Sequence, residues 1–407
     1  MLHGPRIASD ARHLHRFARM LTGCCLLAMV TASVTTAAPP EKDTRERLER
    51  QEAIRNHLEQ SYLIGPAAAE SFGYTVDWQF PVPSKEVSMV TSHDDRIFVV
   101  TVTNDLICLQ ADNGRRIWSV SVADKLEIVH SITFMPENEL VLVLTNSMLV
   151  TLDSNTGMTK AAVLGKAHQE LQWIANTPGV LSGDHLIYGA RNGQLVWQTW
   201  KIGFAWKAYQ AAGSLRLPPV MSGNIICTTS SDGVVSAFDT DTATQMWNAR
   251  LLDSIVAKAA TSEHAIYVAG IDQHLRAFDI RTGRTLWRVL TESALVDPPT
   301  LIGDHVYQQI PGLGLACFDA LPVNKLDGDR KWICPDNNGT VVARHGDTLV
   351  TWDPSSRVLA TVSATQGTPI HSKQYPNIEE IAATSMQDGK LLAVGDDGRL
   401  ICLDPMR

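Results

Sequence analysis

From residue 75 onwards, the sequence alternates between short hydrophobic, β-rich runs and polar turns. Runs such as Ile225-Ile226-Cys227 and 234–238 are too short for helices and suit strands. Asn-Gly and Asp-Gly pairs separate several runs, as at Asn192-Gly193 and Asp232-Gly233. These pairs tolerate the positive φ that two-residue hairpin turns require. The pattern therefore predicts a series of antiparallel hairpins.

The runs recur with a period of about forty residues, which is the length of one four-stranded propeller blade. Consecutive units begin 39 to 46 residues apart. The first aligned strand of each unit begins near Ile97, Leu140, Leu186, Ile225, Ile266, Val306, Leu349 and Leu391. The sequence thus predicts an all-β fold, an eight-bladed β-propeller of four-stranded antiparallel blades over residues 75–407.

The two ends of this region complement each other. The last unit reaches Leu403-Asp404 without a following tryptophan-bearing strand, whereas a spare strand of that kind, 75–80, precedes the first unit. We therefore expect residues 75–80 to pair with the C-terminal blade and close the ring. Radial repetition also explains how so long a chain can form one domain.

Each unit carries a turn that has its own chemistry. In the most complete copy, Ala277 to Trp287, Asp279 can accept backbone N–H bonds, Gly283 supplies positive φ, and Trp287 opens the next strand. Burying one tryptophan removes roughly 150–250 Å² of surface from water. The predicted turn residues are Asp153, Gly157, Asp239, Asp279, Thr282, Gly283, Asp319, Gly328 and Asp404. The predicted blade-docking residues are Trp78, Trp118, Trp247, Trp287 and Trp332.

The segment 277–287 resembles the repeat Ala-x-Asp-x-x-Thr-Gly-x-x-x-Trp of the pyrroloquinoline quinone (PQQ)-like propeller family. The copy 237–247 keeps this pattern except that Ala243 replaces the glycine. The resemblance implies an eight-bladed ring with one of two functions. Some members are dehydrogenases that hold PQQ and calcium, and others, similar to the assembly factor BamB, are non-enzymatic scaffolds.

The residues favour the scaffold. The dehydrogenases characteristically place a disulfide of adjacent cysteines against the quinone, and the only adjacent pair here is Cys24-Cys25, near the N-terminus. No acidic residue stands out from the repeated turns. We therefore predict no catalytic residue, cofactor or metal site, and an envelope protein as partner. A PQQ-dependent dehydrogenase and a small-ligand or sugar-binding propeller are the alternatives.

Two further groups of residues leave their roles open. Trp197, Trp200 and Trp206 cluster in one degenerate unit, where they pack internally or form an exposed aromatic patch for a partner. Cys317 and Cys334 flank one turn, and a disulfide between them fits an oxidising compartment.

The N-terminal region has the features of a targeting signal. Residues 1–38 contain four arginines, a short apolar core from Met20 to Val30 and small residues before Pro39, as in a cleaved secretory signal. Leu21-Thr22-Gly23-Cys24 looks like a lipobox, but the apolar core follows the cysteine instead of preceding it, which argues against a lipid anchor. The densely charged residues 39–74 are expected to form a helical tether. We thus expect an exported, periplasmic or envelope-associated protein without a membrane span in the mature chain.

Composition adds two constraints. The net charge of −8 over 407 residues gives no reason to expect nucleic acid as a partner. The chain has ten tryptophans against nine phenylalanines, an excess for which the repeated docking position accounts in part.

Overall fold

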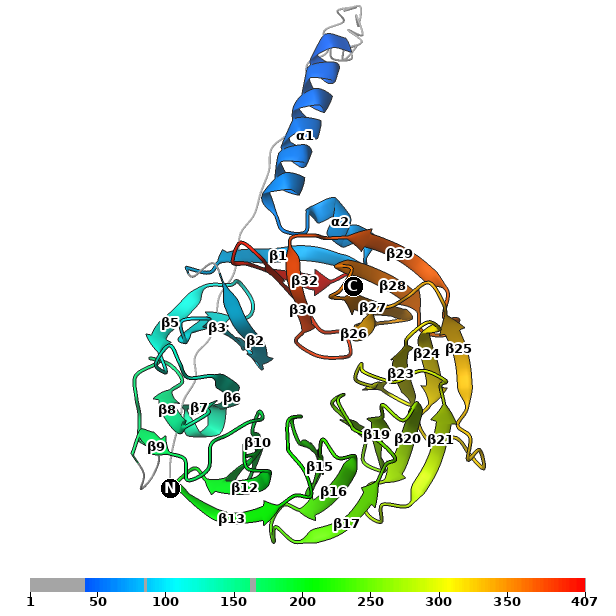
Figure 1. The fold of residues 1–407 in the computed structure, drawn as a ribbon. Coiled ribbons are helices and arrows are strands. Elements are labelled where there is room, and N and C mark those ends of the chain that lie inside the picture. The colour runs from blue at the N-terminus through cyan, green and yellow to red at the C-terminus, as the bar shows by residue number, and fades with distance from the viewer. Residues whose placement is uncertain (1–40, 84–85, 162–165, 407) are drawn as a thin grey trace, which may run out of the picture. The chain divides into compact units, whose positions relative to one another are not determined.

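Eight four-stranded antiparallel sheets form the blades of a ring in the computed structural model, which describes residues 41–83, 86–161 and 166–406 (Figure 1). The predicted all-β, eight-bladed propeller is confirmed. In each blade, hydrogen-bonded neighbours follow one another from the centre of the ring to its rim (Figure 1).

We number the blades along the chain and give their strands from the innermost to the outermost. Blades 1 and 2 consist of β2 (Val87–His93), β3 (Arg96–Thr101), β4 (Asp105–Gln110), β5 (Arg116–Ser121) and β6 (Val129–Met135), β7 (Leu140–Thr145), β8 (Met148–Asp153), β9 (His168–Glu170). Blades 3 and 4 consist of β10 (Val180–Ser182), β11 (His185–Gly189), β12 (Gln194–Thr199), β13 (Phe204–Gln210) and β14 (Val220–Ser222), β15 (Ile225–Thr229), β16 (Val234–Asp239), β17 (Gln245–Arg250).

The second half of the ring repeats this plan. Blades 5 and 6 consist of β18 (Ala260–Thr261), β19 (Ala265–Ala269), β20 (His274–Asp279), β21 (Thr285–Leu290) and β22 (Thr300–Ile302), β23 (His305–Ile310), β24 (Gly314–Asp319), β25 (Arg330–Cys334). Blades 7 and 8 consist of β26 (Thr340–His345), β27 (Thr348–Asp353), β28 (Val358–Ser363), β29 (Pro369–Gln374) and β30 (Ile378–Ala383), β31 (Leu391–Gly395), β32 (Arg399–Pro405), β1 (Tyr74–Pro81). The second strand of every blade begins within one residue of its predicted start.

Blade 8 combines strands from both ends of the ring-forming region. Strand β1 runs antiparallel to β32, with Tyr74 opposite Pro405 and Pro81 opposite Arg399. The ammonium group of Lys390 lies 2.6 Å from the Asp77 carboxylate, so an ion pair adds to the backbone pairing.

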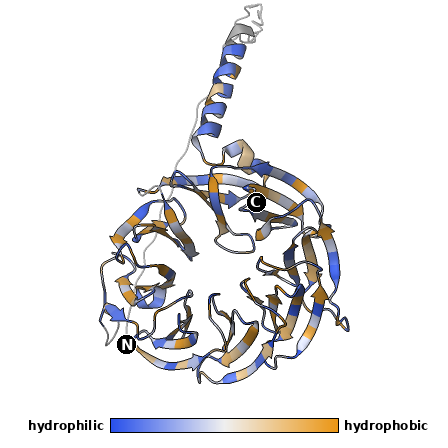
Figure 2. Ribbon diagram, in the orientation of Figure 1, coloured by the Kyte–Doolittle hydropathy of each residue, from blue (hydrophilic) through white to orange (hydrophobic). Residues whose placement is uncertain are grey.

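From residue 41, where the described part of the chain begins, two helices precede β1, namely α1 (Glu41–Ser61) and α2 (Pro66–Ser71). The compact unit that contains the ring begins at Ala53, within α1. Helix α1 is largely hydrophilic, whereas the blade strands carry hydrophobic segments (Figure 2). The Glu59 carboxylate accepts hydrogen bonds from the amides of Ala67 and Ala68 and so satisfies two of the free N–H groups at the start of α2. The predicted signal, residues 1–38, lies outside the described residues.

The hydrophobic core is divided among the interfaces between blades. Eight apolar clusters occur, one between each pair of neighbouring blades. The cluster between blades 7 and 8 also takes in Leu63, Ile64 and Phe72 from the segment before β1. These three side chains therefore pack in the propeller core, although they precede the predicted boundary at residue 75.

Candidate functional site

The five predicted docking tryptophans all contact the following blade in the same way. Each lies on the outermost strand of its blade, and its indole N–H donates to a backbone carbonyl of the next blade over 2.8–3.0 Å. The pairs are Trp78 with Ala111, Trp118 with Ser154, Trp247 with Ile280, Trp287 with Ala320, and Trp332 with Ala364. These five indoles therefore hold neighbouring blades together.

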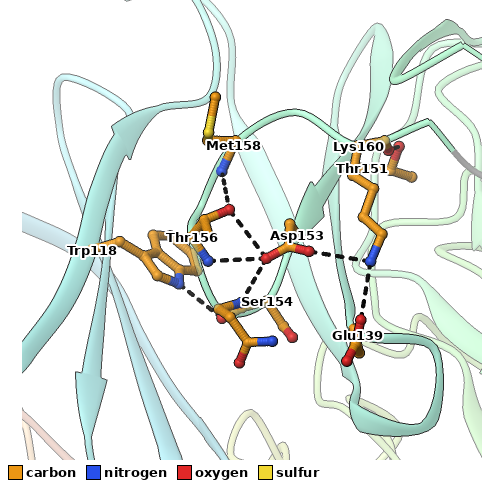
Figure 3. Close-up of polar contacts among 9 residues, drawn as sticks. Trp118, Glu139, Thr151, Asp153, Ser154, Thr156, Met158 and Lys160 are labelled. Carbon is orange, nitrogen blue, oxygen red and sulfur yellow. Dashed lines mark hydrogen bonds and ion pairs between the residues drawn. The ribbon is translucent and has the colours of Figure 1, made fainter.

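Several of the turns that receive an indole are held by an aspartate just before the receiving carbonyl. In blade 2, the Asp153 carboxylate accepts bonds from the amide and hydroxyl of Thr156, at 3.0 Å each, and pairs with Lys160 (Figure 3). The hydrogen bond from Lys160 is the main reason why the pKa of Asp153 lies below its usual range. Asp239 and Asp279 make the same bonds to Thr242 and Thr282.

The turn glycines combine positive φ with close contact. Gly157 has φ +69°, and a Cβ added there would lie 2.6 Å from the Trp118 ring. Gly283 has φ +70° and stands in the same relation to Trp247. Gly328 also has positive φ, but the nearest atom to an added Cβ belongs to Val289.

Two predicted turn aspartates depart from this pattern. Asp319 bonds the amide of Leu321 and pairs with Lys331 in a longer turn. Asp404 lies within β32, opposite Thr75, and its carboxylate faces Lys390. The prediction of a turn role for Asp404 is therefore wrong, because strand pairing continues through this residue.

Trp197 is a sixth docking tryptophan, but it lies on β12 and not on the outermost strand of its blade. It lies on β12 opposite Lys207, so it occupies the motif's alanine position while Lys207 occupies the tryptophan position. Its indole N–H nevertheless donates to the Thr240 carbonyl of blade 4, at 3.1 Å. The side chain is fully buried, and the prediction of an exposed patch is wrong for this residue.

This exchange explains the alanine that replaces glycine in blade 4. Ala243 has φ +51° and packs in the same buried cluster as Trp197. Because the indole enters from β12, the strand next to the outermost one, this turn accommodates the methyl group of Ala243. The sequence contained both departures, but only the structure shows that one compensates for the other.

Two interfaces use other side chains in place of tryptophan. Gln169 on β9 donates to the Trp200 carbonyl of blade 3, at 2.8 Å. On β29, His371 packs edge-on against Phe72, with 4.6 Å between the ring centroids. Sequence reasoning missed both residues, because a glutamine and a histidine carry no pattern that distinguishes them from surface residues.

The remaining tryptophans of blade 3 separate into one buried and one exposed. Trp200 is 2% exposed and donates its N–H to Gly183, so the prediction of an exposed patch is wrong for it as well. Trp206 is 43% exposed and stacks on His185, with 4.8 Å between the ring centroids. Burial lowers the pKa of His185, which favours its uncharged form in this stack.

Two further exposed apolar residues lie close to Trp206 in the sequence. Ile202 and Phe204 are 41% and 51% exposed, and Phe204 and Trp206 lie on the outermost strand, β13. We call Ile202, Phe204 and Trp206 the blade 3 patch. Of the three tryptophans predicted as a surface, only Trp206 reaches solvent.

The described cysteines form no disulfide. Cys334 lies opposite Leu315, whereas Cys317 lies opposite Trp332. Both thiols are free and buried, so the considered pairing of Cys317 with Cys334 does not occur. Burial raises the pKa of Cys108, Cys227, Cys317 and Cys402 to about 12.

Two other features of the described residues bear on ligands. A cavity of about 510 Å³ opens between the inner strands of blades 4 to 7, with aliphatic side chains, Lys258 and Met386 in its wall. No group of three or more His, Cys, Asp or Glu residues in the described ranges is arranged to hold a metal ion.

None of the helices described here has the length and apolarity to cross a membrane.

Comparison with known protein families identifies the ring. A family model described as outer membrane protein assembly factor BamB matches residues 73–186 and 182–407. The chain belongs to the BamB family. These two matches together cover all eight blades and the strand β1, so the BamB family assignment rests on the whole propeller.

The individual proteins that this chain is similar to are distant from it in sequence. BamB of Bordetella pertussis is 25% identical over 217 residues, which are 49% of this chain and 55%, about half, of that relative's length. The crystal structure of BamB from Moraxella catarrhalis is 18% identical, with a TM-score of 0.64 over 81% of this chain and 97% of that one. The computationally designed Ika8 protein is 12% identical, with a TM-score of 0.60 over 80% of this chain and 98% of its own. At these identities, the solved structures support the fold.

Proposed function

We propose that the protein is a non-enzymatic scaffold for the assembly of outer membrane proteins. The observation that carries this proposal is the BamB family match over the whole ring, residues 73–407. The relative from Bordetella pertussis bears the same description. The protein would act by presenting the surfaces of a rigid ring to other envelope proteins.

The use of the repeat residues supports a scaffold. The motif aspartates bond the turns that follow them, as Asp239 does with Thr242. The motif tryptophans are buried between blades, as Trp287 is at 1% exposure. Their polar groups therefore stabilise the ring, and surface side chains would carry out recognition.

Export and the class of partner follow from the N-terminal sequence and the charge. A basic region followed by a short apolar core and small residues within 1–38 is typical of a secretory signal. We infer a periplasmic or envelope-associated protein without a lipid anchor. Its partners would be envelope proteins, since the net charge of −8 is unfavourable for binding nucleic acid.

The proposal is tested in the native host. The tagged chain is crosslinked in living cells, and the products are identified by mass spectrometry beside a control that lacks residues 1–38. We expect crosslinks to outer-membrane assembly proteins with the full chain only, and reduced levels of β-barrel proteins in the outer membrane when the gene is deleted. Unchanged levels together with no envelope crosslinks would contradict the proposal.

A reconstitution separates the scaffold from an enzyme. The purified chain is mixed with PQQ and calcium, and its visible spectrum and dye reduction with alcohol and aldose substrates are recorded. We expect no bound-quinone spectrum and no turnover. Quinone-dependent turnover would assign the protein to the dehydrogenases.

A further inference from the structure

The innermost strand of blade 7 ends at a histidine that contacts two other segments of the chain. His345 is the last residue of β26. Its Nδ1 lies 2.8 Å from the Asp388 carboxylate, in the turn between β30 and β31, and its Nε2 lies 2.7 Å from the carbonyl oxygen of Met406, directly after β32. We call His345, Asp388 and the Met406 carbonyl the closure clasp. It connects blade 7 with an inner turn of blade 8 and with the end of the strand that pairs with β1.

Both segments that the closure clasp holds also make backbone hydrogen bonds beside it. The amide of Met406 donates to the Gly73 carbonyl at 2.9 Å, next to the start of β1. The amide of Asp388 donates to the Arg344 carbonyl, and the amide of Arg344 donates to the Met386 carbonyl, at 2.8 Å each. The turn of blade 8 therefore lies along β26. Because Met386 is part of the wall of the 510 Å³ cavity, the closure clasp also holds one side of that cavity.

Both partners of the His345 ring accept hydrogen bonds and donate none. An ionised carboxylate and a backbone carbonyl offer lone pairs, whereas a neutral imidazole carries one N–H and one lone pair. With a neutral ring, one of the two short contacts of His345 would therefore bring two lone pairs together. The imidazolium donates from both nitrogens and carries a charge opposite to that of Asp388. The geometry thus matches the protonated ring.

The other titratable and charged groups around His345 leave this pairing intact. The Tyr74 ring centroid lies 6.4 Å from that of His345, and burial, followed by the charge of Asp388, raises the pKa of Tyr74 to about 12, so this phenol is uncharged at neutral pH. The Arg344 guanidinium donates to a carbonyl of its own turn, and the Asp347 carboxylate accepts hydrogen bonds from side chains of its own blade. Asp388 is therefore the described carboxylate that pairs with His345.

We propose that protonation of His345 fastens the junction between blades 7 and 8, and that the closure clasp weakens when the ring loses this proton. An ordinary histidine changes charge near pH 6.5. The contribution of the closure clasp is therefore full in mildly acidic solution and is lost as the ring titrates at higher pH. This pH response goes beyond the proposed scaffold, because it belongs to the ring itself and requires no partner.

Two other histidines respond in the opposite direction, so the measurement has to be local. Burial lowers the pKa of His93 and of His130, which lie on the innermost strands of blades 1 and 2. Since the folded protein disfavours their charged forms, acid destabilises the ring at these positions. The overall stability therefore combines opposing effects, whereas amide hydrogen exchange reports on each segment separately.

The test follows hydrogen–deuterium exchange of the full-length protein by mass spectrometry at pH 5.5 and pH 8, with rates corrected for the intrinsic effect of pH on exchange. Peptides that contain Asp388 and Met406 report on the closure clasp, since the amides of both residues donate backbone hydrogen bonds beside it. Their protection should be about three- to fivefold higher at pH 5.5, as for a partly exposed ion pair of favourable geometry.

Variants assign the effect to the ring of His345. His345→Gln retains a donor and an acceptor but cannot gain a proton, so the protection of both peptides should no longer depend on pH. Asp388→Asn keeps an accepting oxygen and tolerates the positive φ of this position, +52°, and it should reduce the pH effect because the charge is lost. The matched control is His264→Gln, since His264 is exposed and lies in the turn after the innermost strand of blade 5. This control should leave the pH effect unchanged.

The outcomes are decisive for the closure clasp. Equal protection of the two peptides at both pH values in the wild type would overturn the inference, and so would a pH effect that persists in His345→Gln. If His345→Gln weakens protection by the same factor at both pH values, the residue contributes packing or a neutral hydrogen bond, and the inference is wrong. Because Asp388→Asn leaves His345 in place, it tests the charge even if the histidine variant folds poorly.

Discussion

The turn that accepts a tryptophan N–H bond should tolerate a methyl group in place of glycine only where the tryptophan lies on the strand next to the outermost one, as Trp197 does. Gly283 has φ +70°, and an added Cβ would lie 2.6 Å from the Trp247 ring. In Gly283→Ala, the left-handed backbone costs about 1–2 kcal/mol, and overpacking against the indole costs about 1–3 kcal/mol. The free energy of unfolding should thus fall by about 2–5 kcal/mol.

The chain contains its own control for this substitution. Ala243 occupies the equivalent turn, also at positive φ, and packs in the same buried cluster as Trp197. In Ala243→Gly, relief of the left-handed conformation by about 1 kcal/mol is offset by the loss of a buried methyl group, worth about 0.8 kcal/mol. The net change should stay within about 1 kcal/mol.

Urea unfolding, followed by tryptophan fluorescence and far-UV circular dichroism, measures both variants. Gly283→Ala should shift the midpoint clearly downwards, while Ala243→Gly should leave it nearly unchanged. In a Trp247→Leu background, which removes the ring that an added Cβ would meet, Gly283→Ala should cost only the backbone term. An equal cost of Gly283→Ala in both backgrounds would refute the reasoning.

Three other predictions concern stability and reactivity. Trp287→Ala should lower the free energy of unfolding by about 3–5 kcal/mol, whereas Trp206→Ser, at an exposed position, should change it by less than about 1 kcal/mol; a large effect of the latter in urea unfolding would contradict the assignment of Trp206 to the surface. The amide of Thr242, followed by its hydroxyl, holds the pKa of Asp239 below its ordinary value, so the stability that this carboxylate contributes is full above the unfolded value of about 3.9 and is lost as the pH falls through the lower folded value. The destabilisation caused by Asp239→Asn at pH 7 should therefore shrink at pH 3, and a constant difference in urea midpoint would contradict this. Because burial raises the pKa of Cys227 to about 12, iodoacetamide at pH 8 should modify it only in denaturant, as peptide mapping would show; rapid modification of the folded protein would contradict its burial.

The repeat made the fold predictable, because hairpin turns and docking tryptophans recur at fixed spacing. The start of the second strand in every blade could be placed to within one residue. Trp78, 329 residues before the end of the chain, could even be assigned to the last blade by the missing tryptophan strand, and it lies opposite Cys402. These features depend on local sequence patterns.

The candidate surface was less predictable, because exposure depends on neighbouring blades. Trp197 and Trp206 both lie in one unit. Trp197 is buried because it docks on blade 4 from β12, whereas Trp206 stacks on His185 and remains partly exposed. Gln169 and His371 dock blades through contacts that no single repeat contains. A pattern within one unit cannot specify which side chain fills the gap to the next.

The pairing of β1 with β32 has a consequence for the order in which the protein folds. Tyr74 belongs to the earliest strand of the ring, and its partner Pro405 belongs to the last. Seven blades take all their strands from consecutive stretches of chain and can form as each stretch emerges during synthesis. The eighth requires a contact between distant segments, which is slow because loop-closure entropy opposes it. Until then, the first-formed strand keeps an unpaired edge, so ring closure is the step at which a helper protein would best protect this chain from aggregation.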